Sequence, residues 1–189
     1  ILELLKKSIL ELELDVKERL MLLLKLIYST DRIQAAAFNF RSDSPRNLGR
    51  GLEILEHTVD LRCKSVLLHI LDKQSPEQKL HQLLEAEITK YEQMVVSERT
   101  RRLLEHENLL SDWCLACCFH FAQVACIRLA SPQILASLRH PTGFVREAAI
   151  AYLHVASRNV LLKILPQLQH DSHPLVVAQV KELMEKYQG

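Results

Sequence analysis

The residues best suited to chemistry lie together in the segment Cys114-Leu115-Ala116-Cys117-Cys118-Phe119-His120. Thiolates at positions i and i+3 of a helix face one direction, and a nearby imidazole would extend such a pair toward a zinc site. A tetrahedral site needs four ligands, however, and the chain has no second Cys-x-x-Cys pair. Because Trp113, Leu115 and Phe119 give the segment the character of a core helix, we interpret the cysteines as packed thiols and expect no metal.

Two further groups of polar residues invite a functional interpretation. His140 and His170 occupy equivalent positions in two similar segments, where an imidazole suits the carboxyl end of a helix better than a paired site. Arg99, Arg101 and Arg102 could form a docking patch for an acidic peptide or a phosphate group. Glutamates interleave with these arginines, which favours a solvated helix face.

The sequence lacks the common catalytic motifs. It contains no GxSxG, P-loop, GxGxxG or HExxH pattern, and its 4 glycines are too few for a phosphate-cradling loop. We therefore expect no enzyme activity and no cofactor. The formal net charge of +1 gives no strong attraction to nucleic acid, and we expect no nucleic-acid partner. The longest apolar run covers only residues 113–119, far short of the roughly 20 residues that cross a bilayer.

Composition favours an all-α fold. Of 189 residues, 48% are hydrophobic, while glycine, proline and aromatic residues are scarce and Leu, Ala, Glu, Lys and Gln fill the long segments. The hydrophobic content is sufficient for a core without a metal or disulfide. Five cysteines, mostly in one apolar segment, indicate reduced thiols and a cytoplasmic location.

Apolar spacing and turn residues divide the chain into helices. Residues 1–28 predict two helices, with Asp15 as the cap of the second, and Ser75-Pro76 predicts the start of a long helix that ends near Tyr91. The polar stretch 92–102 is the expected irregular connection between N-terminal hairpins at 1–91 and C-terminal hairpins at 103–189. The remaining helices are expected near 33–40, 45–57, 59–71, 100–107, 111–128, 132–139, 143–157, 159–169 and 174–187.

An internal repeat supports this division. Ile134-Leu135-Ala136-Ser137-Leu138-Arg139-His140 aligns with Ile164-Leu165-Pro166-Gln167-Leu168-Gln169-His170, at an offset of 164 − 134 = 30 residues. The register continues beyond the turn, where Ile150 and Leu153 align with Val180 and Leu183. A repeat of this length is one supersecondary unit that buries its apolar face against its neighbours.

The repeated units resemble the HEAT-repeat family. In that family an apolar helix and a short turn precede a second helix that opens with Val-Arg-x-x-Ala, and Phe144-Val145-Arg146-Glu147-Ala148-Ala149 matches this opening. The turn at 140–143 lacks the family's Asp, whereas Asp171 is present in the next turn, in which Val176 replaces the expected Arg. The resemblance is good over 103–187, weaker over 33–72 and generic over 1–28.

The resemblance implies an α-solenoid of stacked antiparallel hairpins, continuous along the chain and built from about 10–12 helices. It also implies that Arg146 joins an Asp–Arg ladder between repeats, with Asp112 or Asp171 as its partner. Second helices would line a partner-binding face. The candidate binding residues are Arg50, Glu53, His57, Arg101, Arg102, Arg146 and Glu147.

These expectations lead to a functional hypothesis. The chain is expected to be a non-catalytic protein-binding or regulatory scaffold, whose partner is another protein, another domain of the same chain or a second copy. The segments 41–57, 67–72 and 111–116 resemble the HEAT region that some bacteria attach to membrane proteins similar to ATP/ADP antiporters, which would tether the chain to a membrane. The alternative is a HEAT-fold enzyme similar to bilin lyases or DNA glycosylases, although no residue here supports either chemistry.

Overall fold

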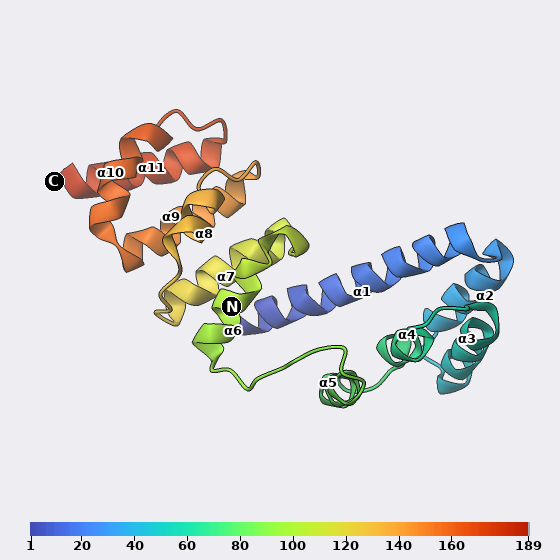
Figure 1. Cartoon of the computed structure of the whole chain (residues 1–189). Coiled ribbons are helices and arrows are strands. Elements are labelled where there is room, and N and C mark those ends of the chain that lie inside the picture. The colour runs from blue at the N-terminus through green and yellow to red at the C-terminus, as the bar shows by residue number, and fades with distance from the viewer. Residues whose placement is uncertain (189) are drawn as a thin grey trace. The chain divides into compact units, whose positions relative to one another are not determined.

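The computed structural model describes residues 1–188, which contain eleven α-helices, one short 3-10 helix and no strand (Figure 1). The expected all-helical class is therefore confirmed. The chain forms two compact units, unit 1 from Ile1–Leu12 with the residues from Met94 on, and unit 2 from Glu13–Gln93. The helices are α1 (Leu2–Ile27), α2 (Thr30–Phe40), α3 (Pro45–Thr58), α4 (Lys64–Leu71), α5 (Pro76–Glu85), α6 (Val96–Glu105), the 3-10 helix η1 (Glu107–Leu109), α7 (Asp112–Val124), α8 (Ser131–Ser137), α9 (Gly143–Ala156), α10 (Arg158–Leu168) and α11 (Pro174–Gln188).

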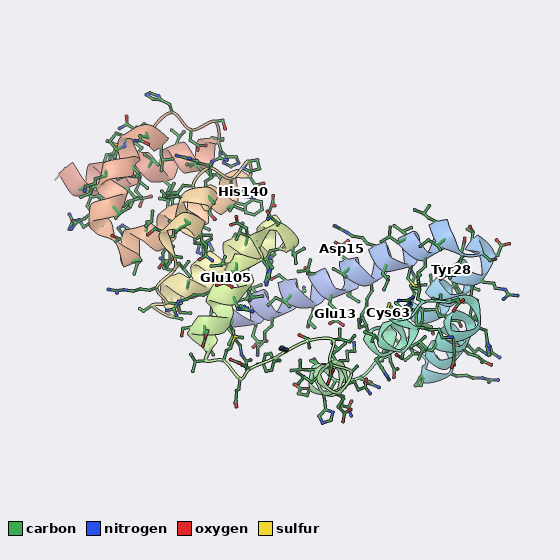
Figure 2. The ribbon with its side chains drawn as sticks, viewed as in Figure 1. Glu13, Asp15, Tyr28, Cys63, Glu105 and His140 are labelled. Atoms are coloured by element: carbon green, nitrogen blue, oxygen red, sulfur yellow. The ribbon has the colours of Figure 1, made fainter. Side chains whose placement is uncertain are left out.

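Residues 2–27 form one helix rather than the two that the sequence predicted. Asp15 does not cap a new helix, because its carboxylate pairs with Arg19 one turn later at 2.7 Å. Lys17 and Glu13 make the same i,i+4 pair at 2.7 Å, and Figure 2 shows Glu13 and Asp15 on the unbroken part of α1. With no glycine or proline to interrupt it, the segment stays helical through the charged stretch.

Unit 2 is built around the packing of α2 on α3. Ile33 and Ala36 of α2 and Leu55 of α3 are fully buried together with Leu24 of α1. Gly51 permits this close approach, because a Cβ atom there would lie 3.0 Å from Phe40 Cε1. The Tyr28 hydroxyl donates to the carbonyl of Asp60 at 3.1 Å and fixes the end of α1 to the α3–α4 turn (Figure 2).

The boundaries of α5 and α6 differ in part from expectation. Ser75 caps α5 as predicted, since its hydroxyl accepts the Gln78 N–H at 3.3 Å. The helix ends at Glu85 rather than near Tyr91, and Glu87 adopts a left-handed φ of 53° that terminates it. The chain is irregular over 86–95 and helical again from Val96. Within the expected connection at 92–102, residues 92–95 are irregular, whereas residues 96–102 belong to α6.

In unit 1, α9 packs against α7, α8, α10 and α11. Ile134 and Ile164, the anchors of the 30-residue repeat, are both half-buried against the same core. Val145 and Leu175 occupy equivalent positions in the helices that follow, but their environments differ. Val145 is buried, whereas Leu175 is 58% exposed. Among the described residues α9 has neighbours on both sides, which accounts for the greater burial of its apolar positions.

No helix in the described part of the chain combines the length and the apolar character that a bilayer crossing needs.

The continuity of α1 can be tested by replacing Val16, which is 55% exposed, with proline. Val16→Pro removes one helical hydrogen bond and clashes with the preceding turn, so we expect it to destabilise the protein by about 3 kcal/mol or more. Circular dichroism at rising urea concentration measures this loss, with Val16→Ala as the control that leaves the midpoint nearly unchanged. A Val16→Pro midpoint equal to that of Val16→Ala would support a helix break near Asp15.

Candidate functional site

The most strongly bonded polar group of unit 1 is the guanidinium of Arg146. Its Nε and Nη2 atoms donate to the two carboxylate oxygens of Asp171 at 2.8 and 2.6 Å. Its Nη1 atom donates to the carbonyls of His140 and Pro141 at 2.5 and 2.8 Å. Both side chains of the ion pair are 8% exposed. Arg146 therefore joins the turn before α9 to the turn before α11, and of the two expected partners, Asp112 and Asp171, it pairs with Asp171.

This pairing lowers the pKa of the Asp171 carboxyl below its ordinary value of 3.8, mainly through the hydrogen bonds from Arg146. The Asp171 carboxylate also accepts the backbone N–H of His173 at 2.8 Å, which orders its own turn. Arg146 thus has an internal role rather than the partner-binding role expected from the sequence.

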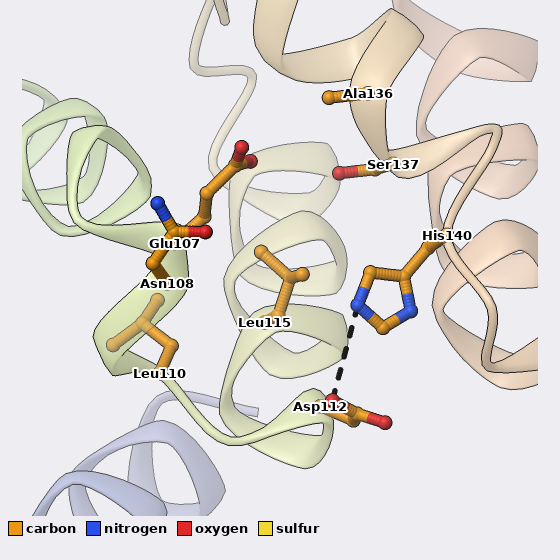
Figure 3. Close-up of a pocket in the computed structure, with 8 residues that line it drawn as sticks. All are labelled: Glu107, Asn108, Leu110, Asp112, Leu115, Ala136, Ser137 and His140. Carbon is orange, nitrogen blue, oxygen red and sulfur yellow. Dashed lines mark ion pairs between the residues drawn. The ribbon is translucent and has the colours of Figure 1, made fainter.

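A second polar contact joins the start of α7 to the turn before α9. The Thr142 hydroxyl donates to Asp112 Oδ2. His140 Nε2 lies 3.9 Å from Asp112 Oδ1, and the dashed line in Figure 3 marks this pair. Beside this contact lies a cavity of about 230 Å³. Its lining comes from η1, α7, α8 and the flanking turns, with Glu107, Asn108, Leu110, Asp112, Leu115, Ala136, Ser137 and His140 (Figure 3).

The cavity contains the residue types of a hydrolase triad but not its geometry. In such a triad one imidazole nitrogen accepts the serine proton while the other faces a carboxylate. Here Nδ1 of His140 accepts the backbone N–H of Thr142 at 3.1 Å, and Nε2 faces Asp112. Within the described residues the buried Ser137 hydroxyl oxygen has no hydrogen-bond partner. Neither ring nitrogen is directed at Ser137, so this arrangement does not activate it as a nucleophile.

The cysteine cluster lies inside the core of unit 1. Cys114, Cys117 and Cys118 are buried with Phe119 and Ala122 of the same helix. A hydrogen bond with the Cys118 thiol lowers the pKa of Cys114 to about 6, whereas this bond and burial raise the pKa of Cys118. No three His, Cys, Asp or Glu side chains in the described chain are placed to hold a metal ion. The thiols are therefore core residues of α7, as their apolar surroundings in the sequence indicated.

The seven candidate binding residues fall in both units and form no single described site. Glu53 and His57 line a shallow groove of about 430 Å³ between α2 and α3, and Arg50 is exposed on α3. On α6, Arg101 donates to the carbonyl of Arg128 at 2.8 Å, and Arg102 lies 3.8 Å from Glu105. The remaining two, Arg146 and Glu147, belong to α9, where Glu147 is half-buried.

A second groove in unit 2, equal in volume to the α2–α3 groove, was not predicted from the sequence. It has a volume of about 430 Å³ and lies between α1, α2, the start of α3 and the end of α4. We call it the cationic groove. Its lining residues are Leu14, Lys17, Glu18, Met21, Leu22, Lys25, Ala37, Phe40, Arg41, Asp43, Leu48, Leu71 and Lys73. The available signal was the spacing of Leu14, Met21 and Lys25, which share a stripe only if α1 is continuous.

Comparison with known proteins found no matching family model, no matching curated protein and no matching solved structure.

The Arg146–Asp171 pair should be essential to the stability of unit 1. Arg146→Ala leaves a buried carboxylate without its partner, and we expect a loss of about 3–5 kcal/mol in unfolding free energy, measured by urea denaturation. Arg139→Ala is the control, because Arg139 is exposed on the helical turn that precedes α9. A loss no larger than that of the control would show that the pair is dispensable.

The same pair predicts a pH dependence. Because the folded-state pKa of Asp171 is lowered, its stabilisation is complete above the ordinary pKa of 3.8 and is lost as the pH falls through the lower folded value. We expect the wild-type unfolding midpoint to decline below about pH 4, and Asp171→Asn to reduce this decline while lowering stability at pH 7. Denaturation curves from pH 7 to pH 2 provide the measurement.

Thiol reactivity can test the burial of the cysteine cluster. Cys63 and Cys126 are exposed, whereas the three cysteines of α7 are buried. We expect a chromogenic disulfide reagent to modify two thiols rapidly in the native protein and the other three only after denaturation. A Cys63→Ser/Cys126→Ser double variant should lose the rapid phase. Rapid modification of that variant would contradict the burial of α7.

Proposed function

We propose that the chain is a non-catalytic protein-binding module whose helical hairpins stack in the manner of HEAT repeats. The observation that carries the proposal is the Arg146–Asp171 bridge, which links corresponding turns of the α8–α9 and α10–α11 hairpins. The 30-residue register from Ile134 to Ile164 supports the same arrangement. A stack held by its turns leaves helix faces available to a partner, which is the usual function of such architectures.

Exposed apolar side chains supply contact area for that partner. Leu26 and Phe38 of unit 2 are 83% and 77% exposed, and Leu22 and Leu23 are 60% and 58% exposed. Apolar surface of this kind, bordered by charge, is characteristic of protein-binding faces. The proposal assigns the partner surface to helix faces, including the α2–α3 groove with Glu53 and His57.

A second proposal concerns the protein to which this chain belongs. It is based on the resemblance of segments 41–57, 67–72 and 111–116 to the HEAT region of antiporter-like membrane proteins. We propose that the chain is a cytoplasmic domain of a larger membrane protein similar to ATP/ADP antiporters. Apolar spans of about 20 residues encoded upstream in the same gene would support this proposal, and a gene without such spans would contradict it.

Selection from a displayed peptide library tests the binding function. We expect enriched peptides to bind the full chain at micromolar concentrations in fluorescence polarisation, while scrambled peptides of equal composition do not. Hydrogen exchange should then place their footprint on helix faces. Equal binding of enriched and scrambled peptides would overturn the proposal. Salt-dependent affinity for duplex DNA, or tight binding of a linear tetrapyrrole, would favour an enzyme of the two alternative classes instead.

A further inference from the structure

The cationic groove of unit 2 combines a buried floor with exposed apolar walls. Met21, Leu48 and Leu71 form the floor and are 6–8% exposed. Leu14 and Leu22 line the same groove but are 62% and 60% exposed. These two leucines leave apolar area in water that a ligand lying along α1 would cover.

The rim of the groove is predominantly positive. Its lining includes four cations, Lys17, Lys25, Arg41 and Lys73, but only two acids, Glu18 and Asp43. Both acids are already paired, Glu18 with Arg41 at 3.6 Å and Asp43 with Lys73 at 2.9 Å, and Lys17 is paired with Glu13, outside the lining, at 2.7 Å. Within the described residues, Lys25 has no carboxylate within 4.0 Å. The groove therefore favours a ligand that brings negative charge.

The length of the groove and the distribution of its cations determine the kind of ligand. From Leu14 to Lys25 the wall follows about three turns of α1, or roughly 16 Å. Lys17 and Lys25 lie about two turns apart on α1, while Arg41 and Lys73 come from other segments. A single-headed amphiphile would need its cations at one end, whereas an acidic helix can present carboxylates along its whole length.

We propose that the cationic groove binds an acidic amphipathic helix of a partner protein. The leucine side chains of that helix cover Leu14 and Leu22, and its glutamates face Lys25 and the neighbouring rim cations. This inference rests on the proposed protein-binding function and names the site and the chemistry of the partner.

The probe is a fluorescein-labelled peptide of about 15 residues, with leucine at the i, i+3, i+4 and i+7 positions of one face and glutamate on the flanks. A second peptide keeps the leucines and replaces glutamate with lysine. We expect the full chain to bind the acidic peptide at least tenfold more tightly than the basic one in fluorescence polarisation, with a preference that declines as salt rises.

Two substitutions with matched controls locate the binding. Leu22→Asn should weaken the acidic peptide roughly tenfold by removing wall area, whereas Leu23→Asn, next in sequence, similarly exposed and outside the groove lining, should not. Lys25→Glu should weaken it roughly fivefold, whereas Arg62→Glu, exposed in the same unit and outside the groove lining, should not. Circular dichroism of each variant checks that the fold is retained.

The outcomes distinguish this inference from the broader function. Equal affinity for the acidic and basic peptides, or equal effects of Leu22→Asn and Leu23→Asn, would overturn the groove assignment. If library-selected peptides still bind elsewhere, the protein-binding function stands and only the inference fails. If no peptide binds, both fail. Binding to phosphatidylserine vesicles that Leu22→Asn and Lys25→Glu abolish, without acidic-peptide binding, would assign the groove to lipid and overturn the inference.

Discussion

A buried arginine remains protonated, so the surrounding chain must supply hydrogen-bond acceptors for its guanidinium. Arg146 meets this constraint with one carboxylate and two backbone carbonyls. The carboxylate belongs to the turn before α11, and the carbonyls belong to the turn that precedes its own helix. The guanidinium thereby fixes two turns to one another, and it lies on the same helix as the buried apolar residues of α9. Core packing and polar pairing therefore meet on one helix of this unit.

Other polar side chains form hydrogen bonds that hold irregular segments of unit 1 in place. The Tyr152 hydroxyl donates to the carbonyl of Ile127 and accepts the N–H of Leu129, which orders the connection between α7 and α8. The hydrogen bond from Thr142 to Asp112 holds the turn before α9 against the start of α7. Histidine and aspartate near such turns can therefore resemble catalytic groups although they are bonded to backbone and neighbouring side chains, as His140 and Asp112 are. Unit 2 has a different character, because its cationic groove has exposed apolar walls and a half-buried lysine, Lys25, without a carboxylate partner.

Local signals in the sequence predicted local features well. Ser75 and Pro76 mark a helix start because capping and proline geometry involve only a few neighbouring residues. The HEAT resemblance left Asp112 and Asp171 as alternative partners of Arg146, and the structure selects Asp171. The prediction of a helix cap at Asp15 was wrong because an aspartate suits a cap and an i,i+4 ion pair equally. Only the continuous backbone decides between the two. The end of α5 was missed because Glu87 occupies a left-handed conformation that glycine or asparagine normally signals. The groove was missed because its lining converges from several helices.

Gly143, in the first turn of α9, leaves room for the side chain of His173. The imidazole of His173 lies where a side chain at position 143 would begin, with its Nδ1 atom 2.7 Å from the place of a Cβ atom and its ring carbons closer still. Even a methyl group there would push His173 outward, and Asp171, two residues earlier, would move with it. Positions 143 and 173 can therefore diverge during evolution only together, so that a bulkier residue at the first would need a smaller one at the second for adjacent hairpins to keep their spacing.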